Sequence, residues 1–268
     1  MSLNTLLDHE NRLRTRMGKA FLGDRVVFRG RDLHHDLGDW DWFRLYVYSI
    51  TGREFSENRL RLLNYIWVAT SYPDPGIWPN HVAALAGAER STASLALMAG
   101  LAVSEATIYG CRPNRKAIEF FYRAAAAVAE GSTVEDFVAE EMRQGRNLYG
   151  YGRPLARIDE RIPHTLRKVE ALGLADGPHL AIALKVYAHL KATKGLSMNI
   201  AAVDAALCAD LGLSPEEYHL FLTPCFIAGM TPCYLDARGK PEGAFFPMRC
   251  DSLASAAKPR RRWDDAGA

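Results

Sequence analysis

The sequence predicts an all-α protein. Apolar residues recur at helical spacing along most of the 268 residues, and helix-capping sequences stand in front of several of these stretches. Sustained alternation of apolar and polar residues between hairpin turns, which is typical of strands, is missing. These observations favour helices throughout, in one large domain or in one domain that carries a smaller lobe.

The first clear helix is expected to begin at Ser56, a good N-cap, and to end before Pro73 and Pro75, because proline cannot continue a helix. The next helical pattern covers residues 78–105. It is rich in Ala, Gly and Ser and almost uncharged in its second half. Neighbouring helices could approach it closely, so we interpret it as one central, buried helix.

Helical patterns continue along the rest of the chain up to Asp236. Further helices are expected from Pro113 to Gly131, from the capping box Ser132–Glu135 to Gly145, and over about residues 163–172, 178–193, 199–211 and 214–235, the last opened by a capping box from Ser214 to Glu217. Residues 145–161 between them are rich in Gly, Tyr and Arg and too irregular for a helix or strand. Loops of this kind often carry function.

Composition narrows the class of partner. The formal net charge of +2 is too small to indicate nucleic acid or membrane binding. The most apolar stretch, residues 93–103, is too short to span a bilayer, and no apolar leader follows the charged start, so a cytoplasmic protein is expected. The tail with Arg260, Arg261 and Arg262 is interpreted as a solvated terminus, since no aromatic platform accompanies it.

Cysteine and histidine give no metal pattern. Five cysteines, at positions 111, 208, 225, 233 and 250, form no CxxC pair and are odd in number, so buried free thiols are expected. His34 and His35 are adjacent, which cannot place both on one helix face, and HxxxH and HExxH are absent. The sequence therefore predicts no metal site.

Several short motifs occur together in a recognisable order. Arg29–Leu33 resembles an RGYD-type entry, and Gly52–Ser56 resembles the turn that ends the helical region after it. Gly150–Pro154 resembles a G-(Y/F)-G-H-P loop, and Asp159–Arg161 resembles the D-P-R behind it. Asn199–Gly229 resembles an N-V-D segment with its leucine-glycine turn. In this order and spacing, the motifs resemble the citrate synthase family and its short citryl-CoA lyase relatives.

This resemblance implies a homodimer of all-α subunits, each with a large domain (residues 1–110 and 199–268) and an inserted small domain (residues 111–198). It also implies chemistry on a small carboxylate or an acyl-CoA, with a coenzyme A thioester as the substrate. No P-loop or GxGxxG motif independently announces a nucleotide. By analogy, Gly150, Tyr151 and Gly152 would line the coenzyme A site.

Three family positions that carry chemistry are changed. Ala201 stands where the family has the aspartate of N-V-D, and it has no proton acceptor. Tyr109 replaces the enol-binding histidine, and a phenol can still donate one hydrogen bond. Arg153 replaces the histidine that polarises the keto-acid carbonyl, and it brings a permanent charge with five donors. Deprotonation by the family route is therefore excluded.

Four further positions complete the expected site. Asp74 lies near the place of an earlier family histidine and is the one obvious carboxylate there. Arg161 matches an arginine that grips a substrate carboxylate, and Asn199 is assigned to substrate binding, whereas Phe226 replaces a second arginine. A plain structural interpretation is also open for Tyr109 as a helix end, for Asp74 as a turn cap, and for Arg153 and Arg161 as partners of backbone carbonyls.

Two hypotheses of different class follow. The first is a citrate-synthase-like transferase or lyase with a repurposed site, in which Arg153 and Arg161 bind anionic groups, Tyr109 stabilises or protonates the reacting oxygen and Asp74 acts as base. The alternative is a non-catalytic homologue that serves for ligand binding or assembly, because Ala201 and Phe226 are inert.

Overall fold

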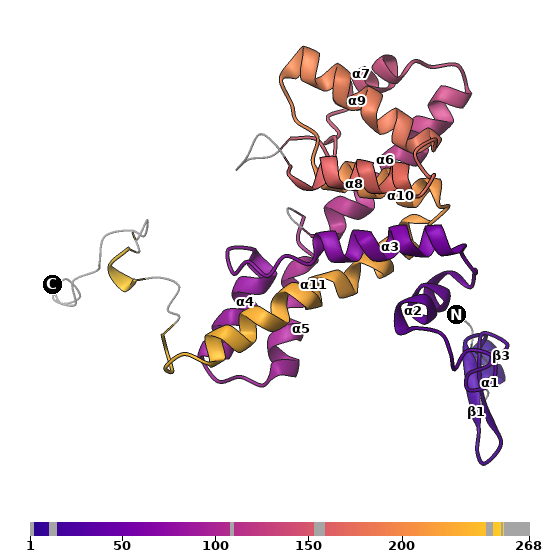
Figure 1. Cartoon of the computed structure of the whole chain (residues 1–268), viewed down its shortest axis with the longest axis vertical. Coiled ribbons are helices and arrows are strands. Elements are labelled where there is room, and N and C mark those ends of the chain that lie inside the picture. The colour runs from indigo at the N-terminus through magenta and orange to yellow at the C-terminus, as the bar shows by residue number, and fades with distance from the viewer. Residues whose placement is uncertain are drawn as a thin grey trace, which may run out of the picture. The chain divides into compact units, whose positions relative to one another are not determined.

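A computed structural model describes residues 3–10, 15–107, 110–152, 159–244, 249–252 and 254. The chain divides into two compact units. The first contains Met1–Tyr72 and Leu101–Ala228, and the second contains Pro73–Gly100 and Gly229–Ala268. Helices dominate both (Figure 1), which confirms the predicted all-α class. The tail with Arg260–Arg262 lies outside the described residues.

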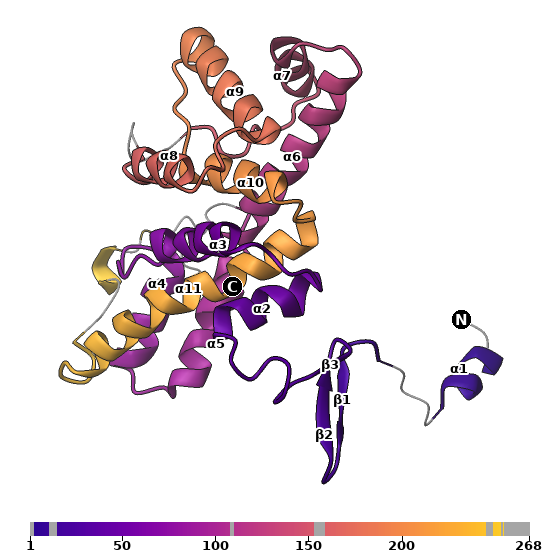
Figure 2. The same ribbon diagram turned by 45° about the vertical axis from the view of Figure 1, so that its right-hand side comes forward.

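The first unit begins with helix α1 (Leu3–His9) and a small antiparallel sheet that the sequence analysis did not predict (Figure 2). Its strands are β1 (Gly18–Phe21), β2 (Arg25–Phe28) and β3 (Arg31–Asp32). With four residues or fewer each, they are too short to show a clear alternation. The Arg29 side chain fixes the turn after β2, because its Nε donates to the carbonyl oxygen of Ser49 at 2.9 Å.

Two helices follow the sheet. Helix α2 (Trp42–Thr51) occupies the helical region that the resemblance implies before the Gly52–Ser56 turn, and Asp41 caps it through a 2.8 Å bond from the Arg44 N–H. Helix α3 (Glu57–Thr70) begins after Ser56, as predicted. The Trp67 indole N–H of α3 donates to the carbonyl oxygen of Phe221 at 2.8 Å, and this bond joins α3 to the first part of α11 (Pro215–Arg238).

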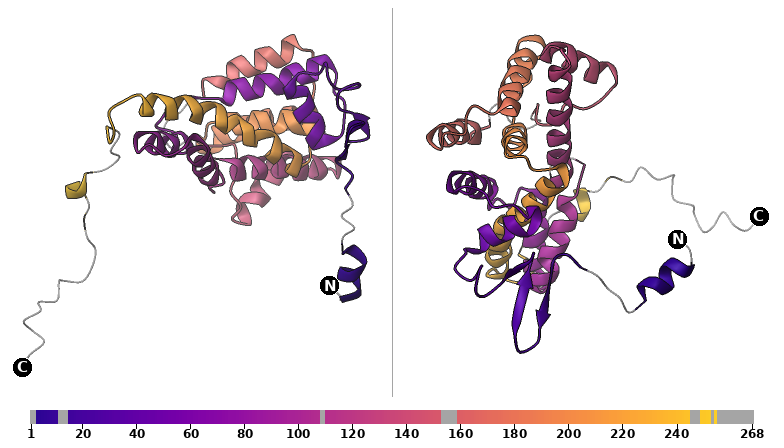
Figure 3. Two further views of the ribbon diagram at one scale, coloured as in Figure 1. Left: turned by 90° about the horizontal axis from the view of Figure 1, so that it is seen from below. Right: turned by 90° about the vertical axis from the view of Figure 1, so that its right-hand side faces the viewer.

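The remaining helices of the first unit pack around α10. They are α6 (Cys111–Ala129), α7 (Val134–Arg143), α8 (Arg161–Ala171), α9 (Pro178–Lys194) and α10 (Ile200–Asp210). Helix α10 is apolar and almost wholly buried, and it contacts α6, α8 and α9. Helices α3 and α8 lie side by side (Figure 3), where the Asn58 amide donates to the Leu172 carbonyl at 3.1 Å. These helices enclose a large apolar core.

The prediction of one buried helix over residues 78–105 is wrong. The segment forms two helices, α4 (Trp78–Ala88) and α5 (Ala93–Ser104), and α5 exposes the large apolar side chains of Leu95 and Met98. Arg90 between them has the left-handed φ of 62°, which ends a helix. Within the second unit, its guanidinium donates to the carbonyl oxygens of Arg238 and Lys240. The side-chain bonds that hold this turn are made far along the chain, so local sequence could not show them.

The capping predictions hold in part. Ser214 and Glu217 form the predicted reciprocal box, with bonds of 3.1 and 2.8 Å. Helix α7 is capped one residue later than expected, because the Thr133 hydroxyl, not that of Ser132, accepts from the Asp136 N–H. The shift leaves the helix itself as predicted.

Helix α11 is long and apolar enough to cross a membrane by length and composition, and 44% of its most apolar window is buried inside the protein. Tyr218, Phe221 and Leu222 belong to the core of the first unit. Cys233 and Ala237 pack with Ala residues of α4 in the second unit. These contacts are those of a core helix.

Candidate active site

The glycine loop and the segment before α10 are bonded to each other. The Gly152 N–H donates to the Ser197 carbonyl at 2.6 Å, and the Asn199 N–H donates to the Gly150 carbonyl at 2.9 Å. Tyr151 and Met198 form an antiparallel bridge between these bonds. The predicted residues Gly150, Tyr151, Gly152 and Asn199 are therefore brought together, although they are almost fifty positions apart.

Gly150 allows this close approach. Its φ is +93°, which side chains rarely adopt, and a Cβ placed on it would lie 2.6 Å from the Cβ of Ala202 and 2.8 Å from its backbone nitrogen. The backbone of the loop therefore rests directly on the first turn of α10. No other residue type fits this position without a shift of the helix.

The Asn199 and Tyr151 side chains are engaged in holding the fold. Asn199 Oδ1 accepts from the Ala201 N–H at 3.0 Å as the N-cap of α10, and Asn199 Nδ2 donates to the Gly152 carbonyl at 3.0 Å. The Tyr151 hydroxyl donates to the Ala183 carbonyl of α9 at 2.9 Å, and burial raises the pKa of this phenol. Both side chains position the loop that the sequence analysis assigned to ligand binding.

Asp159 and Arg161 form a buried ion pair beside the same helix start. Arg161 Nε and Nη2 donate to the two oxygens of Asp159 at 2.8 Å each, and Asp159 Oδ2 also accepts from the Ile200 N–H at 2.9 Å. The Arg161 guanidinium lies over the Tyr72 ring, 5.1 Å from its centroid. Burial opposes the charge of Arg161, but the bonds to Asp159 outweigh it and raise the pKa of Arg161.

Asp204 is a buried carboxyl group that the sequence analysis missed. It lies on α10, one helical turn beyond Ala201, and is 4% exposed. Burial raises the pKa of Asp204 to about 8; the charge of Arg161 opposes this rise and that of Asp159 adds to it. The carboxyl is therefore mostly protonated at neutral pH. The signal for Asp204 in the sequence was its spacing from Ala201, since residues three apart share a helix face.

The structure does not add the other predicted residues to this group, because Asp74 is described in the second unit and two more lie outside the described residues. Asp74 belongs to the second unit, where its Oδ1 accepts from the Gly76 N–H at 2.8 Å and its carbonyl accepts from the Ile77 N–H at 3.0 Å. These bonds are those of a turn, which was the plain structural alternative. Tyr109 and Arg153 lie outside the described residues.

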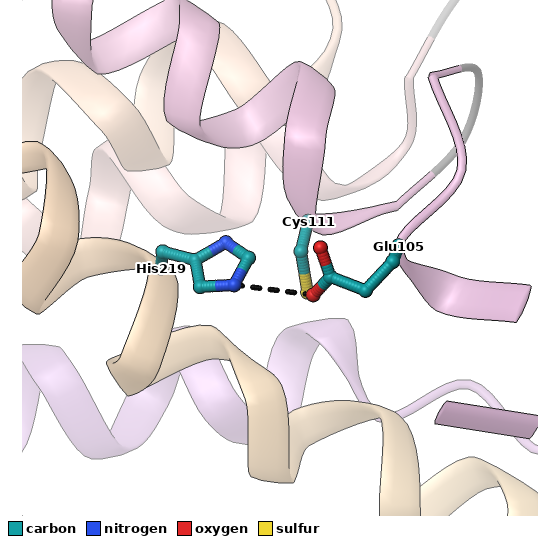
Figure 4. Close-up of side chains that lie close together, drawn as sticks. All are labelled: Glu105, Cys111 and His219. Carbon is teal, nitrogen blue, oxygen red and sulfur yellow. Dashed lines mark ion pairs between the residues drawn. The ribbon is translucent and has the colours of Figure 1, made fainter. Parts of the chain in front are cut away.

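A second polar cluster contains Glu105, Cys111 and His219 (Figure 4). The His219 Nε2 lies 3.1 Å from Glu105 Oε1, and one atom of each residue lies within 4.8 Å of the other two. Burial raises the pKa of the Cys111 thiol to about 11; Glu105 adds to this rise, whereas bonds with Thr223 and Ser104 oppose it. The thiol is therefore neutral at pH 7.

No spaced motif announces this cluster, because its members come from three separate segments: the residue directly after α5, the start of α6 and the first part of α11. The prediction of buried free thiols is confirmed for Cys111, Cys208, Cys225 and Cys233. Only the fold shows that one of these thiols has polar partners.

Comparison with known proteins identifies the fold. No family model matches the sequence, and no curated protein matches it by sequence. Citryl-CoA lyase from Hydrogenobacter thermophilus is similar in structure, with a TM-score of 0.81 at 17% identity over 95% of this chain and 98% of that one. ATP citrate lyase from Methanosaeta concilii, in complex with (3S)-citryl-CoA, gives 0.76 at 18% identity over 97% of this chain and 45% of that one.

Citrate synthase from Thermoplasma acidophilum, in a ternary complex with carboxymethyl coenzyme A and oxaloacetate, gives a TM-score of 0.59 at 15% identity. The match covers 84% of this chain and 60% of that one. The chain therefore has the citrate synthase-like fold that its motifs predicted.

Proposed function

We propose that this protein is a lyase or transferase of the citrate synthase-like type, acting on a small carboxylate or an acyl thioester through a repurposed site. One observation carries the proposal. The Gly150–Gly152 loop, Asn199 and the Asp159–Arg161 pair converge on the first turn of α10, although they come from three separate segments. A convergence of this kind is expected of a site and is not needed for a helical core alone.

Asp204 is the residue that we assign to proton transfer. Ala201 has no group for this purpose, and Asp204 follows it by one turn on the same helix. A carboxyl group with a pKa of about 8 is largely protonated at pH 7 and can donate a proton to a developing oxyanion. After donation, the charge of Arg161 stabilises the carboxylate. Asp74, the base suggested by the resemblance, stays a prediction.

Arg161 supplies positive charge for an anionic substrate. Two of its five guanidinium N–H groups donate to Asp159, and among the described residues no hydrogen bond of the other three is found, so we assign them to a ligand carboxylate. Arg153 and Tyr109 are assigned by resemblance, Arg153 to a second anionic group and Tyr109 to the reacting oxygen. The substrate that combines these features is a carboxylate-bearing thioester, and structural neighbours are complexed with citryl-CoA or with coenzyme A and citrate.

Assembly is proposed from the same fold. Helix α5 carries no charged residue, and Leu95 and Met98 on it are 63% and 67% exposed. Apolar exposure of this extent is typical of a subunit interface. We propose a cytoplasmic homodimer, with residues 111–198 as the small domain of each subunit.

A non-catalytic, ligand-binding or assembly role is the second candidate. Two observations favour it. The side chains of Asn199 and Tyr151 are already used in hydrogen bonds that hold the fold, and Asp159 neutralises the charge of Arg161. Under this alternative, the protein binds a carboxylate or coenzyme A without turnover.

Calorimetry and a cleavage assay separate the two candidates. Coenzyme A, acetyl-CoA, oxaloacetate and citrate are titrated into the wild-type protein and Arg153→Ala, and citryl-CoA cleavage to acetyl-CoA and oxaloacetate is followed in parallel. Arg143→Ala is the matched control, because Arg143 is an exposed arginine paired with Glu140. We expect saturable binding that Arg153→Ala weakens at least tenfold and Arg143→Ala leaves unchanged.

Turnover decides between enzyme and binding protein. We expect Asp204→Asn and Tyr109→Phe to lower the turnover number at least a hundredfold with little change in ligand affinity. Binding without turnover in the wild-type protein would establish the second candidate. Absence of both binding and turnover with every ligand would refute the proposed substrate class.

A further inference from the structure

We propose that Glu105, Cys111 and His219 form a binding site for a divalent transition metal ion of the zinc class. The site does not depend on the proposed lyase or transferase activity. Its basis is the geometry in Figure 4, where one carboxylate, one thiol and one imidazole point toward a common position. Sulfur, nitrogen and oxygen from these three residue types are the ligands that zinc takes in proteins.

The distances fit a tetrahedral ion after small side-chain movements. A tetrahedral zinc site with typical bond lengths places its ligand atoms about 3.3 to 3.6 Å apart. The Glu105 Oε1 to His219 Nε2 distance is already 3.1 Å, and all three ligand atoms lie within 4.8 Å of one another. Binding of an ion therefore requires the ligand atoms to approach the Cys111 sulfur by no more than about 1 Å, and rotation of the half-exposed Glu105 side chain can supply part of this movement.

The ring nitrogen that would bind the ion is defined. His219 Nδ1 is buried and has no hydrogen-bond partner among the described residues, whereas Nε2 faces Glu105. The imidazole of His219 is 18% exposed and Cys111 is fully buried, so two ligands are held by the core. Glu105, at 49% exposure, leaves the site open to solvent on one side. A water molecule can occupy the fourth position.

The charges balance when the ion binds. Coordination converts the Cys111 thiol to a thiolate and releases its proton to solvent, as metal binding to cysteine requires. The thiolate and the Glu105 carboxylate then supply two negative charges against the two positive charges of the ion, while His219 stays neutral. A site of zero net charge is compatible with its partly buried position.

Cobalt(II) is the probe for this site, because a thiolate bound to Co²⁺ gives a charge-transfer absorption that carboxylates and imidazoles do not. The full chain, purified in the presence of a chelator and then freed of it, is titrated with Co²⁺ and afterwards with Zn²⁺. We expect one Co²⁺ per chain with thiolate charge transfer and tetrahedral absorption, and displacement by one equivalent of Zn²⁺.

Matched variants assign the ligands. Cys111→Ser should abolish the charge-transfer absorption, and Glu105→Gln and His219→Ala should weaken binding at least tenfold. Cys233→Ser, at another buried free cysteine, and His35→Ala, at an exposed histidine, should bind as the wild type does. If Cys111→Ser fails to fold by circular dichroism, Glu105→Gln decides, since its half-exposed side chain is not needed for packing.

Absence of the charge-transfer absorption in the wild-type protein would overturn the proposal, as would its survival in a folded Cys111→Ser variant. Wild-type affinity in Glu105→Gln or equal loss in Cys233→Ser would also overturn it. Because the readout is spectroscopic, these outcomes are independent of whether the protein turns over citryl-CoA.

Discussion

Arg161 and Asp159 form an ion pair with two hydrogen bonds of 2.8 Å, and the same Asp159 carboxylate accepts from the Ile200 N–H at the start of α10. One buried carboxylate thus holds both the arginine proposed to bind substrate and the helix on which Asp204 lies. The pair therefore connects the segment 159–161 to the start of α10.

Asp159→Asn is expected to destabilise the protein by about 3 kcal/mol, because it leaves the Arg161 charge without its buried partner. Urea unfolding followed by circular dichroism measures the change. The control is Arg143→Ala, which removes an exposed pair and should cost at most about 1 kcal/mol. Equal effects of the two substitutions would show that the Asp159–Arg161 pair contributes no more than a surface pair.

Gly150→Ala should be more damaging than Gly152→Ala. The two glycines have nearly the same φ, +93° and +92°, so an alanine suffers similar backbone strain at either position. At Gly150, the added Cβ would also lie 2.6 Å from Ala202, whereas at Gly152 the nearest atom is 3.9 Å away. We expect Gly150→Ala to cost at least about 1 kcal/mol more in the free energy of unfolding, because overpacking adds to the strain.

Thermal unfolding of both variants tests this expectation with Gly152→Ala as the internal control. A difference close to zero would mean that α10 yields to the added methyl group without loss of packing. The comparison isolates the close approach of loop and helix from the conformational preference of glycine.

Local signals in the sequence predict most helices of this fold. Caps such as Ser214 with Glu217, and stops such as Gly131, act within a few residues and are therefore visible in the chain. The turn at Arg90 was missed, because the bonds that hold its side chain go to residues almost 150 positions away. The short strands β1, β2 and β3 were missed for lack of length.

The candidate site was only partly predictable. The motifs predicted that Gly150, Arg161 and Asn199 belong to one site, and the structure brings their segments together at the start of α10. Asp204 was missed, since its unusual pKa comes from burial among packed helices and not from its neighbours in sequence. Burial of a charged residue type is a tertiary property, and the pattern of a single helix does not reveal it.

Glu141 should give a pH-dependent contribution to stability. Its carboxylate is 1% exposed and bonded to Arg123 and Arg146 at 2.7 and 2.6 Å. Burial alone would raise its pKa, but the two arginines outweigh burial and lower the pKa of Glu141 below its usual 4.5. The contribution is therefore present above pH 4.5 and is lost as the pH falls through the lowered value.

Glu141→Gln removes this contribution. We expect the variant to be less stable than the wild type at pH 7, with a difference that shrinks below pH 4.5, as measured by urea unfolding over a pH series. Glu140→Gln, at an exposed neighbouring position, is the control and should change stability far less. A Glu141→Gln deficit that stays constant down to pH 3 would contradict the assignment.

Asp204 should have the opposite dependence on pH. Its pKa is raised to about 8 in the folded protein, whereas an unfolded aspartate has a pKa near 3.8. Between these values the folded state holds a proton that the unfolded state has released, so folding stability falls as the pH rises from about 4 to about 8, by up to about 1.4 kcal/mol per pH unit. Above pH 8 the contribution of this group becomes constant.

Asp204→Asn replaces the protonated carboxyl with a neutral amide of the same shape and removes this dependence. We expect the variant to match the wild type near pH 4 and to become the more stable protein as the pH approaches 8, while citryl-CoA turnover is lost. Gain of stability together with loss of turnover distinguishes a strained functional carboxyl group from a structural one, whose replacement would cost stability. A variant that is less stable than the wild type at pH 8 would refute the raised pKa and, with it, the assignment of Asp204 to proton transfer.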